Sequence, residues 1–303
     1  MINFEPLTLS QREAYNRLLF RGRERGCEFS FSNLFLWGRQ RGAILGEHFV
    51  LFSQFNRRTV YPYPVGTGDV KPALDAIIAD ARERGIPCRI TGLDEQECRL
   101  IDALYPGKFR IHCDRDSYDY VYDINDLADL KGRKYQKKRN HLNKFRALYP
   151  DAFVTSITPE LLPRVKEMAK RWYEEKLRQD PTGDYHMERS ALKKALSNLE
   201  ELGMESLVLM NGEEVLAFTL GSQLSPETFD IHFEKAAENA DGAYPAINCE
   251  FARYLREKYP QVKYLNREDD LGLEGLRKAK LSYNPHHLTE KCWACLLEDG
   301  YDY

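Results

Sequence analysis

Three adjacent carboxylates, Glu268, Asp269 and Asp270, lie in the short loop NREDDLG, directly after an apolar run typical of a strand. Neighbouring carboxylates repel one another, which raises the pKa of one of them and suits it to accept a proton. Glu268, with Asp269 beside it, is therefore the first candidate for a general base or for orienting a cationic amine. The alternative is a solvated acidic turn that caps a helix near Leu271.

A second polar loop, DGAYPAIN at residues 241–248, leads into a predicted helix. The apolar run 229–233 before it alternates as a strand does, and Pro245 suits the first position of a helix. Backbone N–H groups at such a terminus attract phosphate or a developing oxyanion. If the protein catalyses a group transfer, Gly242 and Ala243 are expected to bind the phosphate of the donor substrate. Tyr244 and Tyr283 could give a proton to the leaving group, although most of the 18 tyrosines should pack in cores.

The segment 131–146, KGRKYQKKRNHLNKFR, carries eight basic side chains and no acidic one. Its apolar residues fall on one stripe at helical spacing, which predicts a basic helix at 131–149 that packs along one edge. Like charges without a partner repel, and a phosphate ligand would relieve that repulsion; a solvated basic helix is the alternative. The expected phosphate-binding side chains here and near the C-terminus are Lys134, Lys138, Arg139, Lys278 and Lys280.

Polar amides near these segments could bind an acceptor. The candidates are Asn140, Asn248 and Asn266, together with Asp270. The same asparagines could instead cap helices and turns, because their side chains bond readily to nearby backbone.

The elements that must position these residues alternate between strands and helices. The first half reads as an α/β or α+β unit. The second half reads as a strand, two helices, an antiparallel meander and then the strand, loop and helix units above, with HHLTEKCWACLLE as a last strand. Asn211-Gly212 predicts a two-residue hairpin turn within the meander.

Composition describes a globular protein of two domains. The chain has 303 residues, and its net charge of −3 gives no overall preference for nucleic acid or membrane. Neither a secretory signal nor an apolar run long enough to span a bilayer is visible, so we expect a cytoplasmic protein.

Seven scattered cysteines are expected to be reduced core thiols. Cys292 and Cys295 form the single CxxC, with His286 and His287 upstream, and this could be read as a zinc site. In a terminal strand, however, positions 292 and 295 would point to opposite faces, so we expect no metal.

The order of elements in the second half is that of the acyl-CoA N-acyltransferase (GNAT-like) folds. Three segments are more specific: LKGRKYQKKRNHLNKF (130–145), DGAYPAIN (241–248) and NREDDLGLEGLRKAKLSYNP (266–285). Together with FSFSNLFLW and YPYPVGTGD in the first half, they resemble the family named for the C-terminal domain of phosphatidylglycerol lysyltransferase. The resemblance covers nearly the whole chain.

This resemblance implies two tandem GNAT-like domains, at 1–130 and 131–303, each a mixed, mostly antiparallel sheet flanked by helices. Such a pair is similar to the Fem-type aminoacyl transferases. Family members fused to membrane helices resemble enzymes that move an amino acid from aminoacyl-tRNA to a lipid headgroup, but this sequence shows no such helices. The Q/R-x-x-G-x-G/A phosphate loop of ordinary GNAT acetyltransferases is also absent, and DGAYPAIN stands in its place.

We therefore expect an acyl or aminoacyl transferase that acts on an amine or hydroxyl acceptor without a bound cofactor or metal. The expected donor is aminoacyl-tRNA, contacted at its acceptor stem, and the acceptor is a small molecule, peptide or lipid headgroup. One alternative is an acyl-CoA-dependent N-acetyltransferase, which would need a splayed strand pair for the pantetheine arm. A second is a non-catalytic protein that binds RNA or phospholipid through the basic helix.

Overall fold

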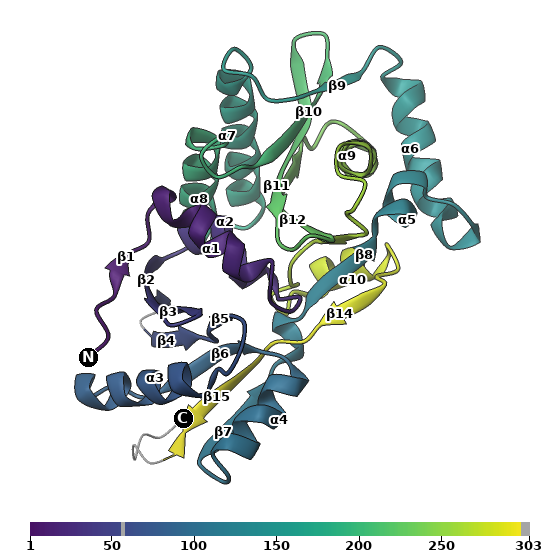
Figure 1. The fold of residues 1–303 in the computed structure, drawn as a ribbon. Helices are drawn as coiled ribbons and strands as arrows, with labels where there is room; N and C mark the ends of the chain where they lie inside the picture. The colour runs from purple at the N-terminus through teal and green to yellow at the C-terminus, as the bar shows by residue number, and fades with distance from the viewer. Residues whose placement is uncertain (56–57, 298–303) are drawn as a thin grey trace. The chain divides into compact units, whose positions relative to one another are not determined.

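The computed structural model describes residues 1–55 and 58–297. Its contacts divide the chain into two compact units (Figure 1). The first comprises Met1–Tyr120, Asp269–Arg277 and the segment that begins at Leu288, and the second comprises Val121–Glu268 and Lys278–His287. Each unit therefore combines segments that are far apart in the sequence. The boundary at residue 130 stays a prediction of where independently folding domains divide.

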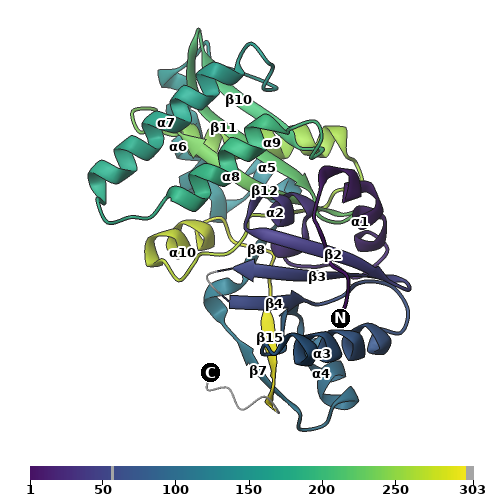
Figure 2. The ribbon, with the colours of Figure 1, turned by 90° about the vertical axis from the view of Figure 1, so that its left-hand side faces the viewer.

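The first unit is built on a mixed sheet with the strand order β1-β2-β3-β4-β6-β15-β7, in which β5 pairs with β3. β4 and β6 are parallel, whereas the other pairs are antiparallel. Figure 2 shows β2, β3 and β4 lying side by side. The strands are β1 (Glu5–Pro6), β2 (Arg39–Leu45), β3 (His48–Phe55), β4 (Arg58–Pro62), β5 (Val65–Gly66), β6 (Arg89–Leu93), β7 (Phe109–Cys113) and β15 (Cys292–Leu296).

Helices flank this sheet, and α4 packs against β6, β7 and β15. They are α1 (Arg12–Leu19), α2 (Phe31–Leu36), α3 (Lys71–Arg84) and α4 (Glu95–Leu104), with short 3-10 helices at Leu9–Gln11, Cys27–Phe29 and Arg115–Ser117. The start of α4 is fixed by a capping box, because the Asp94 carboxylate accepts from the N–H of Glu97 and the Glu97 carboxylate accepts from the N–H of Asp94.

The second unit contains a sheet with the order β14-β8-β13-β12-β11-β10-β9. Only β12 and β13 form a parallel pair among the pairings described for it. α7 and α8 lie on one face, and α9 covers the other with α5 and α6 packed against it (Figure 1). The strands are β8 (Asp119–Asp123), β9 (Phe153–Thr155), β10 (Glu205–Asn211), β11 (Glu214–Gln223), β12 (Thr228–Ala236), β13 (Tyr264–Asn266) and β14 (His287–Thr289).

The helices of the second unit include the predicted basic helix, which begins as a 3-10 turn at Arg133–Tyr135 and continues as α6. They are α5 (Ile124–Asp129), α6 (Gln136–Leu148), α7 (Leu162–Gln179), α8 (His186–Ser197) and α9 (Ala243–Lys258); α10 (Glu274–Leu281) contributes residues to both units. Pro245 lies at the third position of α9 rather than the first, because Gly242 with a φ of 81° takes the N-cap.

Two expectations about the strands need correction. The stretch HHLTEKCWACLLE forms two strands, β14 and β15, in different sheets. The chain leaves the first strand before Lys291, whose ammonium pairs with the buried Asp119 carboxylate at 2.5 Å. The hairpin between β10 and β11 is present, but Asn211 pairs with Glu214 and the central residues are Gly212 and Glu213. A glycine with φ of 57° at the first central position is what a type II′ turn requires.

The expectation of reduced core thiols is wrong for one pair. Cys113 at the end of β7 and Cys292 at the start of β15 lie directly opposite each other and are joined by a disulfide. The sequence could not indicate this pairing, because the two residues are 179 positions apart. No helix in residues 1–55 and 58–297 combines the length and the apolar character that crossing a bilayer would require.

The capping box of α4 gives a stability prediction. Asp94→Ala should lower the free energy of unfolding by about 1 kcal/mol, because an N–H in the first turn loses its acceptor. Urea unfolding measures the change. Asp102→Ala, the same substitution at an exposed position of the same helix, is the control and should change stability by less than about 0.5 kcal/mol. Equal effects of the two variants would contradict the capping role.

Candidate active site in the second unit

The candidate site lies where β12 and β13 separate. Their parallel pairing extends over three residue pairs, from Thr228 opposite Tyr264 to Asp230 opposite Asn266. β13 then ends, whereas β12 continues to Ala236, and no described strand covers that edge of β12 beyond Asp230. A register shift opposite Leu220 also inserts His232 as an extra residue in β12. Such a bulge redirects side chains and is common beside active sites.

A buried ion pair fills part of this opening. The Arg267 guanidinium donates to the Glu234 carboxylate at 2.8 Å, and the Asn248 side-chain amide donates to the same carboxylate at 3.1 Å. The side chains of Glu234 and Arg267 are only 10% and 15% exposed. Arg267 Nη1 and Asn248 Oδ1 are nevertheless buried without a hydrogen-bond partner. Orphaned buried polar atoms are uncommon, so this donor and this acceptor suit a ligand.

A second cation, Lys138 of α6, lies beside this pair. Its ammonium sits 3.7 Å from the centre of the Tyr283 ring, and the Arg267 guanidinium is 4.9 Å from the same ring. Burial and the nearby Arg267 charge together lower the pKa of Lys138 to about 8, while Glu234 opposes the shift. Two cations thus share one carboxylate, and the excess positive charge favours an anion or an oxyanion.

Behind these residues His232 lies between a hydroxyl and two carboxylates. Its Nε2 is 2.7 Å from Ser222 Oγ, and its Nδ1 is 3.4 Å from Glu268 Oε1 and 3.5 Å from Asp230 Oδ2. The side chains of His232 and Asp230 are fully buried, whereas that of Glu268 is 24% exposed. A histidine between a hydroxyl and a carboxylate can relay a proton, and here the carboxylate at the surface end is Glu268.

The backbone of Glu268 is held in an uncommon conformation. Its φ of 59° lies in the left-handed region, which a residue other than glycine rarely adopts. The Asn266 side-chain oxygen accepts from the Glu268 N–H at 2.7 Å, and the Lys280 ammonium donates to the carbonyls of Arg267 and Glu268 at 2.5 and 3.1 Å. Predicted residues Asn266 and Lys280 thus position Glu268 through its backbone.

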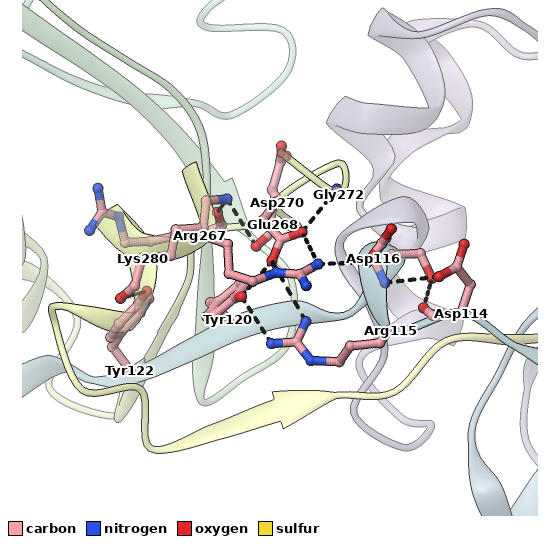
Figure 3. A network of polar contacts seen from close by, with 12 residues as sticks. Asp114, Arg115, Asp116, Tyr120, Tyr122, Arg267, Glu268, Asp270, Gly272 and Lys280 are labelled. Carbon is pink, nitrogen blue, oxygen red and sulfur yellow. Dashed lines mark hydrogen bonds and ion pairs between the residues drawn. The ribbon is translucent and has the colours of Figure 1, made fainter. Parts of the chain in front are cut away.

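The three carboxylates of NREDDLG do not act as one cluster. Asp269 and Asp270 belong to the first unit, unlike Glu268. The buried Asp270 carboxylate accepts from Tyr120 Oη at 2.5 Å, Arg277 Nε at 2.8 Å and the Gly272 N–H at 2.9 Å (Figure 3). The hydrogen bonds from Arg277 hold the pKa of Asp270 well below its ordinary value. Asp270 thus closes the turn before α10, but it is buried and ion-paired rather than solvated as the alternative expected.

In the folded protein the basic helix carries less unpaired positive charge than its sequence suggests. Lys134 pairs with Asp126 at 2.8 Å, and Arg139 donates to the backbone carbonyls of Leu130 and Gly132. Three further basic side chains also have acidic partners, in the pairs Lys131–Asp129, Lys144–Asp241 and Arg146–Glu250. Acidic partners from elsewhere in the chain therefore neutralise four of the eight basic residues of the segment, and Lys138 lies beside the site. Lys278 and Asn140 are exposed.

The predicted phosphate loop before α9 is covered by α6. A Cβ at Gly242 would lie 2.7 Å from the carbonyl oxygen of His141, and the N–H of Ala243 already donates to the Ala240 carbonyl. The Tyr244 hydroxyl accepts from Trp172 Nε1 at 3.0 Å, and burial raises the pKa of this tyrosine. Burial also raises the pKa of Tyr283.

Sequence reasoning missed five residues of this site: Ser222, Asp230, His232, Glu234 and Arg267. One signal was available. Polar residues at positions 230, 232 and 234 interrupt an otherwise apolar strand, and a buried strand has little reason to carry a histidine and two acids.

Residues 20–295 match the family model described as phosphatidylglycerol lysyltransferase, C-terminal. The chain belongs to this family. A crystal structure of a conserved protein of unknown function from Bacteroides thetaiotaomicron VPI-5482 is 39% identical, with a TM-score of 0.93 over 98% of this chain and 100% of that one. An uncharacterized curated relative from Mycoplasmoides gallisepticum is 23% identical over 176 residues, and the match spans only 55% of that protein.

More distant structures share the fold. The structure of L-PGS from Bacillus licheniformis is 16% identical, with a TM-score of 0.72 over 100% of this chain and 95% of that one. FemX is 13% identical, with a TM-score of 0.62 over 98% of each chain. A tandem GNAT protein from the clavulanic acid biosynthesis pathway is 11% identical, with a TM-score of 0.50 over 99% of each chain. These likenesses confirm the predicted tandem GNAT-like fold. Family and fold together point to an acyltransferase of the lysyltransferase, Fem and GNAT type.

The buried pair of Asp270 and Arg277 predicts a pH-dependent stability effect. Because the pKa of Asp270 is lowered in the folded state, its contribution is complete above the unfolded pKa near 4 and declines as pH falls below it. Asp270→Asn should therefore cost about 3 kcal/mol at pH 7 and progressively less below about pH 4. Urea unfolding at a series of pH values measures this.

The matched control is Asp116→Asn, because Asp116 accepts from the same arginine at 2.6 Å but is half-exposed. Its effect at pH 7 should stay below about 1 kcal/mol. A cost for Asp270→Asn that did not change with pH would show that packing, rather than the charge, is responsible.

Proposed function

We propose that this chain is an aminoacyl transferase that takes the aminoacyl group of an aminoacyl-tRNA and joins it to an amine or hydroxyl acceptor at the β12–β13 opening. The observation that carries the proposal is the buried Arg267, whose Nη1 lacks an acceptor while Lys138 adds a second positive charge beside it. Membership of the lysyltransferase family supports the choice of donor. The acyltransferase class rests on family and fold, whereas the donor and acceptor belong to the proposal.

Each residue of the site has its own role in the proposed reaction. The donor ester carbonyl lies against Arg267 Nη1 and Lys138, which stabilise the oxyanion of the tetrahedral intermediate. Asn248 Oδ1, which lacks a donor, accepts from the α-amino group of the aminoacyl moiety. Glu268 takes the proton of the acceptor nucleophile, and His232 and Ser222 orient it from behind.

The bonds balance without a redox step. The new bond joins the acyl carbon to the acceptor nitrogen or oxygen, and the bond to the terminal ribose oxygen of the tRNA breaks. That oxygen leaves with a proton, for which Tyr283 is the proposed donor, because burial keeps its hydroxyl protonated.

An acyl-CoA donor is the second candidate, because a splayed parallel pair is what a pantetheine arm would need. Two features disfavour it. The N-terminus of α9 is packed against α6, and the opening is occupied by the charged Glu234–Arg267 pair. Titration of the protein with aminoacyl-tRNA and with acetyl-CoA at two salt concentrations separates the candidates, since only tRNA binding should weaken steeply with salt. Saturable binding of acetyl-CoA without tRNA affinity would overturn the proposal.

Catalysis should depend on the Glu268 carboxylate. Glu268→Gln keeps the size of the side chain but cannot accept the proton, so the turnover number should fall at least about 100-fold with little change in tRNA affinity. The assay follows release of a labelled amino acid from aminoacyl-tRNA when pooled peptide and lipid acceptors are added. Glu274→Gln, at an exposed position on α10, should retain full activity. If Glu268→Gln released the labelled amino acid from aminoacyl-tRNA as fast as the wild type, only a binding role would remain for the site.

Binding of the donor should depend on pH through Lys138. This lysine is charged at pH 7 and loses its proton as pH rises through about 8. Affinity for an aminoacyl-tRNA analogue with a stable amide in place of the ester should therefore fall about tenfold between pH 7 and 9. Lys138→Arg should remove this dependence, because arginine stays charged. Lys137→Arg, at the exposed neighbouring position, should keep the wild-type profile. Identical profiles for all three proteins would exclude Lys138 as the titrating group.

A further inference from the structure

Three cysteines from three elements of the first unit gather at one point. They are Cys98 on α4, Cys113 at the end of β7 and Cys292 at the start of β15, and their sulfur atoms all lie within 4.8 Å of one another. Cys113 and Cys292 are opposite residues of antiparallel strands, with Cα atoms 4.1 Å apart, and form the disulfide. Cys98 is a third thiol within reach of that bond.

We propose that these residues form a reversible thiol–disulfide site, in which Cys113 is the entry point and Cys98 is an alternative partner for Cys292. The solvent exposure of each cysteine side chain indicates which of the three reacts first. Cys113 is exposed, Cys98 is half-buried and Cys292 is buried. The other four cysteines of the chain, at positions 27, 88, 249 and 295, are all buried and cannot be reached in the same way.

The chemistry needs an oxidant of the low-molecular-weight disulfide class. In the reduced protein, the Cys113 thiolate attacks a sulfur of the small disulfide, and one small thiol leaves. The Cys292 thiolate then attacks the Cys113 sulfur of this mixed disulfide, which forms the protein disulfide and releases the second small thiol. The two cysteines lose two electrons, which reduce the small disulfide. Exchange to Cys98 involves no further oxidant, since its thiolate attacks Cys292 and Cys113 leaves as the thiol.

The surroundings of Cys98 favour the pair seen in the structure. Burial raises the pKa of Cys98 to about 11 together with the smaller effect of nearby carboxylates, which are those of Asp94, Glu97, Glu290 and Glu95. The neighbouring Tyr118 is uncharged at neutral pH. Because the thiolate is the attacking species, Cys98 reacts slowly at neutral pH and faster as pH rises. At neutral pH the exchange to Cys98 is therefore slow, and the Cys113–Cys292 disulfide seen in the structure persists.

Peptide mapping by mass spectrometry after differential alkylation tests the proposal on the full chain. With dithiothreitol removed and oxidised glutathione added, wild type and Cys98→Ser should form the Cys113–Cys292 link, whereas Cys113→Ser should form Cys98–Cys292. In the reduced wild type at pH 7, alkylation of Cys113 should exceed that of Cys98 by on the order of 100-fold, and the gap should narrow at higher pH.

Cys249→Ser serves as the control, because this buried thiol lies in the second unit and donates to a backbone carbonyl that serine can also reach. It should leave the pattern of links unchanged. Two results would overturn the proposal. One is a Cys113→Ser variant that unfolds at the wild-type temperature yet forms no Cys98–Cys292 link. The other is zinc released from the purified protein when a mercurial blocks the three thiols, which would identify a metal site instead.

Discussion

The early end of β13 beside β12 is the constraint on which the candidate site depends. A parallel pair that stops after three residues leaves the rest of β12 with an uncovered edge, and buried backbone groups without partners are costly. The chain fills the opening with polar side chains rather than with another strand. The hydrogen bonds from Asn248 and Arg267 to Glu234 belong to this polar filling.

Electrostatics then decides what the opening can bind. A buried guanidinium is tolerated only with a partner, and Glu234 supplies one. One carboxylate cannot neutralise both Arg267 and Lys138, and the Arg267 charge adds to the effect of burial in lowering the pKa of Lys138. This excess of positive charge supports the proposal that the site binds an anion or a strongly polarised carbonyl. Along the rest of the basic segment the balance is different, because Lys134, Lys144 and Arg146 pair with Asp126, Asp241 and Glu250.

Sequence reasoning reached the fold and part of the site for identifiable reasons. Period-two and helical patterns are local, and the quoted motifs carry the family, so the tandem fold followed from them. Lys138, Asn248 and Glu268 were found because they lie in unusual polar segments. Arg267 was passed over although it stands inside the same motif, because the three acids beside it suggested a purely acidic loop.

Other features could not be read from local sequence. The acidic partners of the basic helix come from α5, α9 and the loop before α9, and only the folded chain brings them close. The order of strands in the two sheets is also non-local, because β15 lies between β6 and β7 in one sheet and β8 lies between β13 and β14 in the other. The Cys113–Cys292 disulfide follows from that topology, because β7 and β15 are neighbours in the sheet although most of the chain lies between them in sequence. No rule of cysteine spacing relates two such residues.

The loop NREDDLG links this fold to its chemistry. Glu268, Leu271 and Gly272 all have positive φ, and these reversals let adjacent acids serve different partners. A left-handed glutamate is strained, and such strain persists only where surrounding bonds over-determine it, as Asn266 and Lys280 do here. Glycine would adopt the same backbone without strain. A loop that only had to turn would therefore be better served by glycine at position 268, and a carboxylate kept in this strained position supports the proposal that Glu268 reacts.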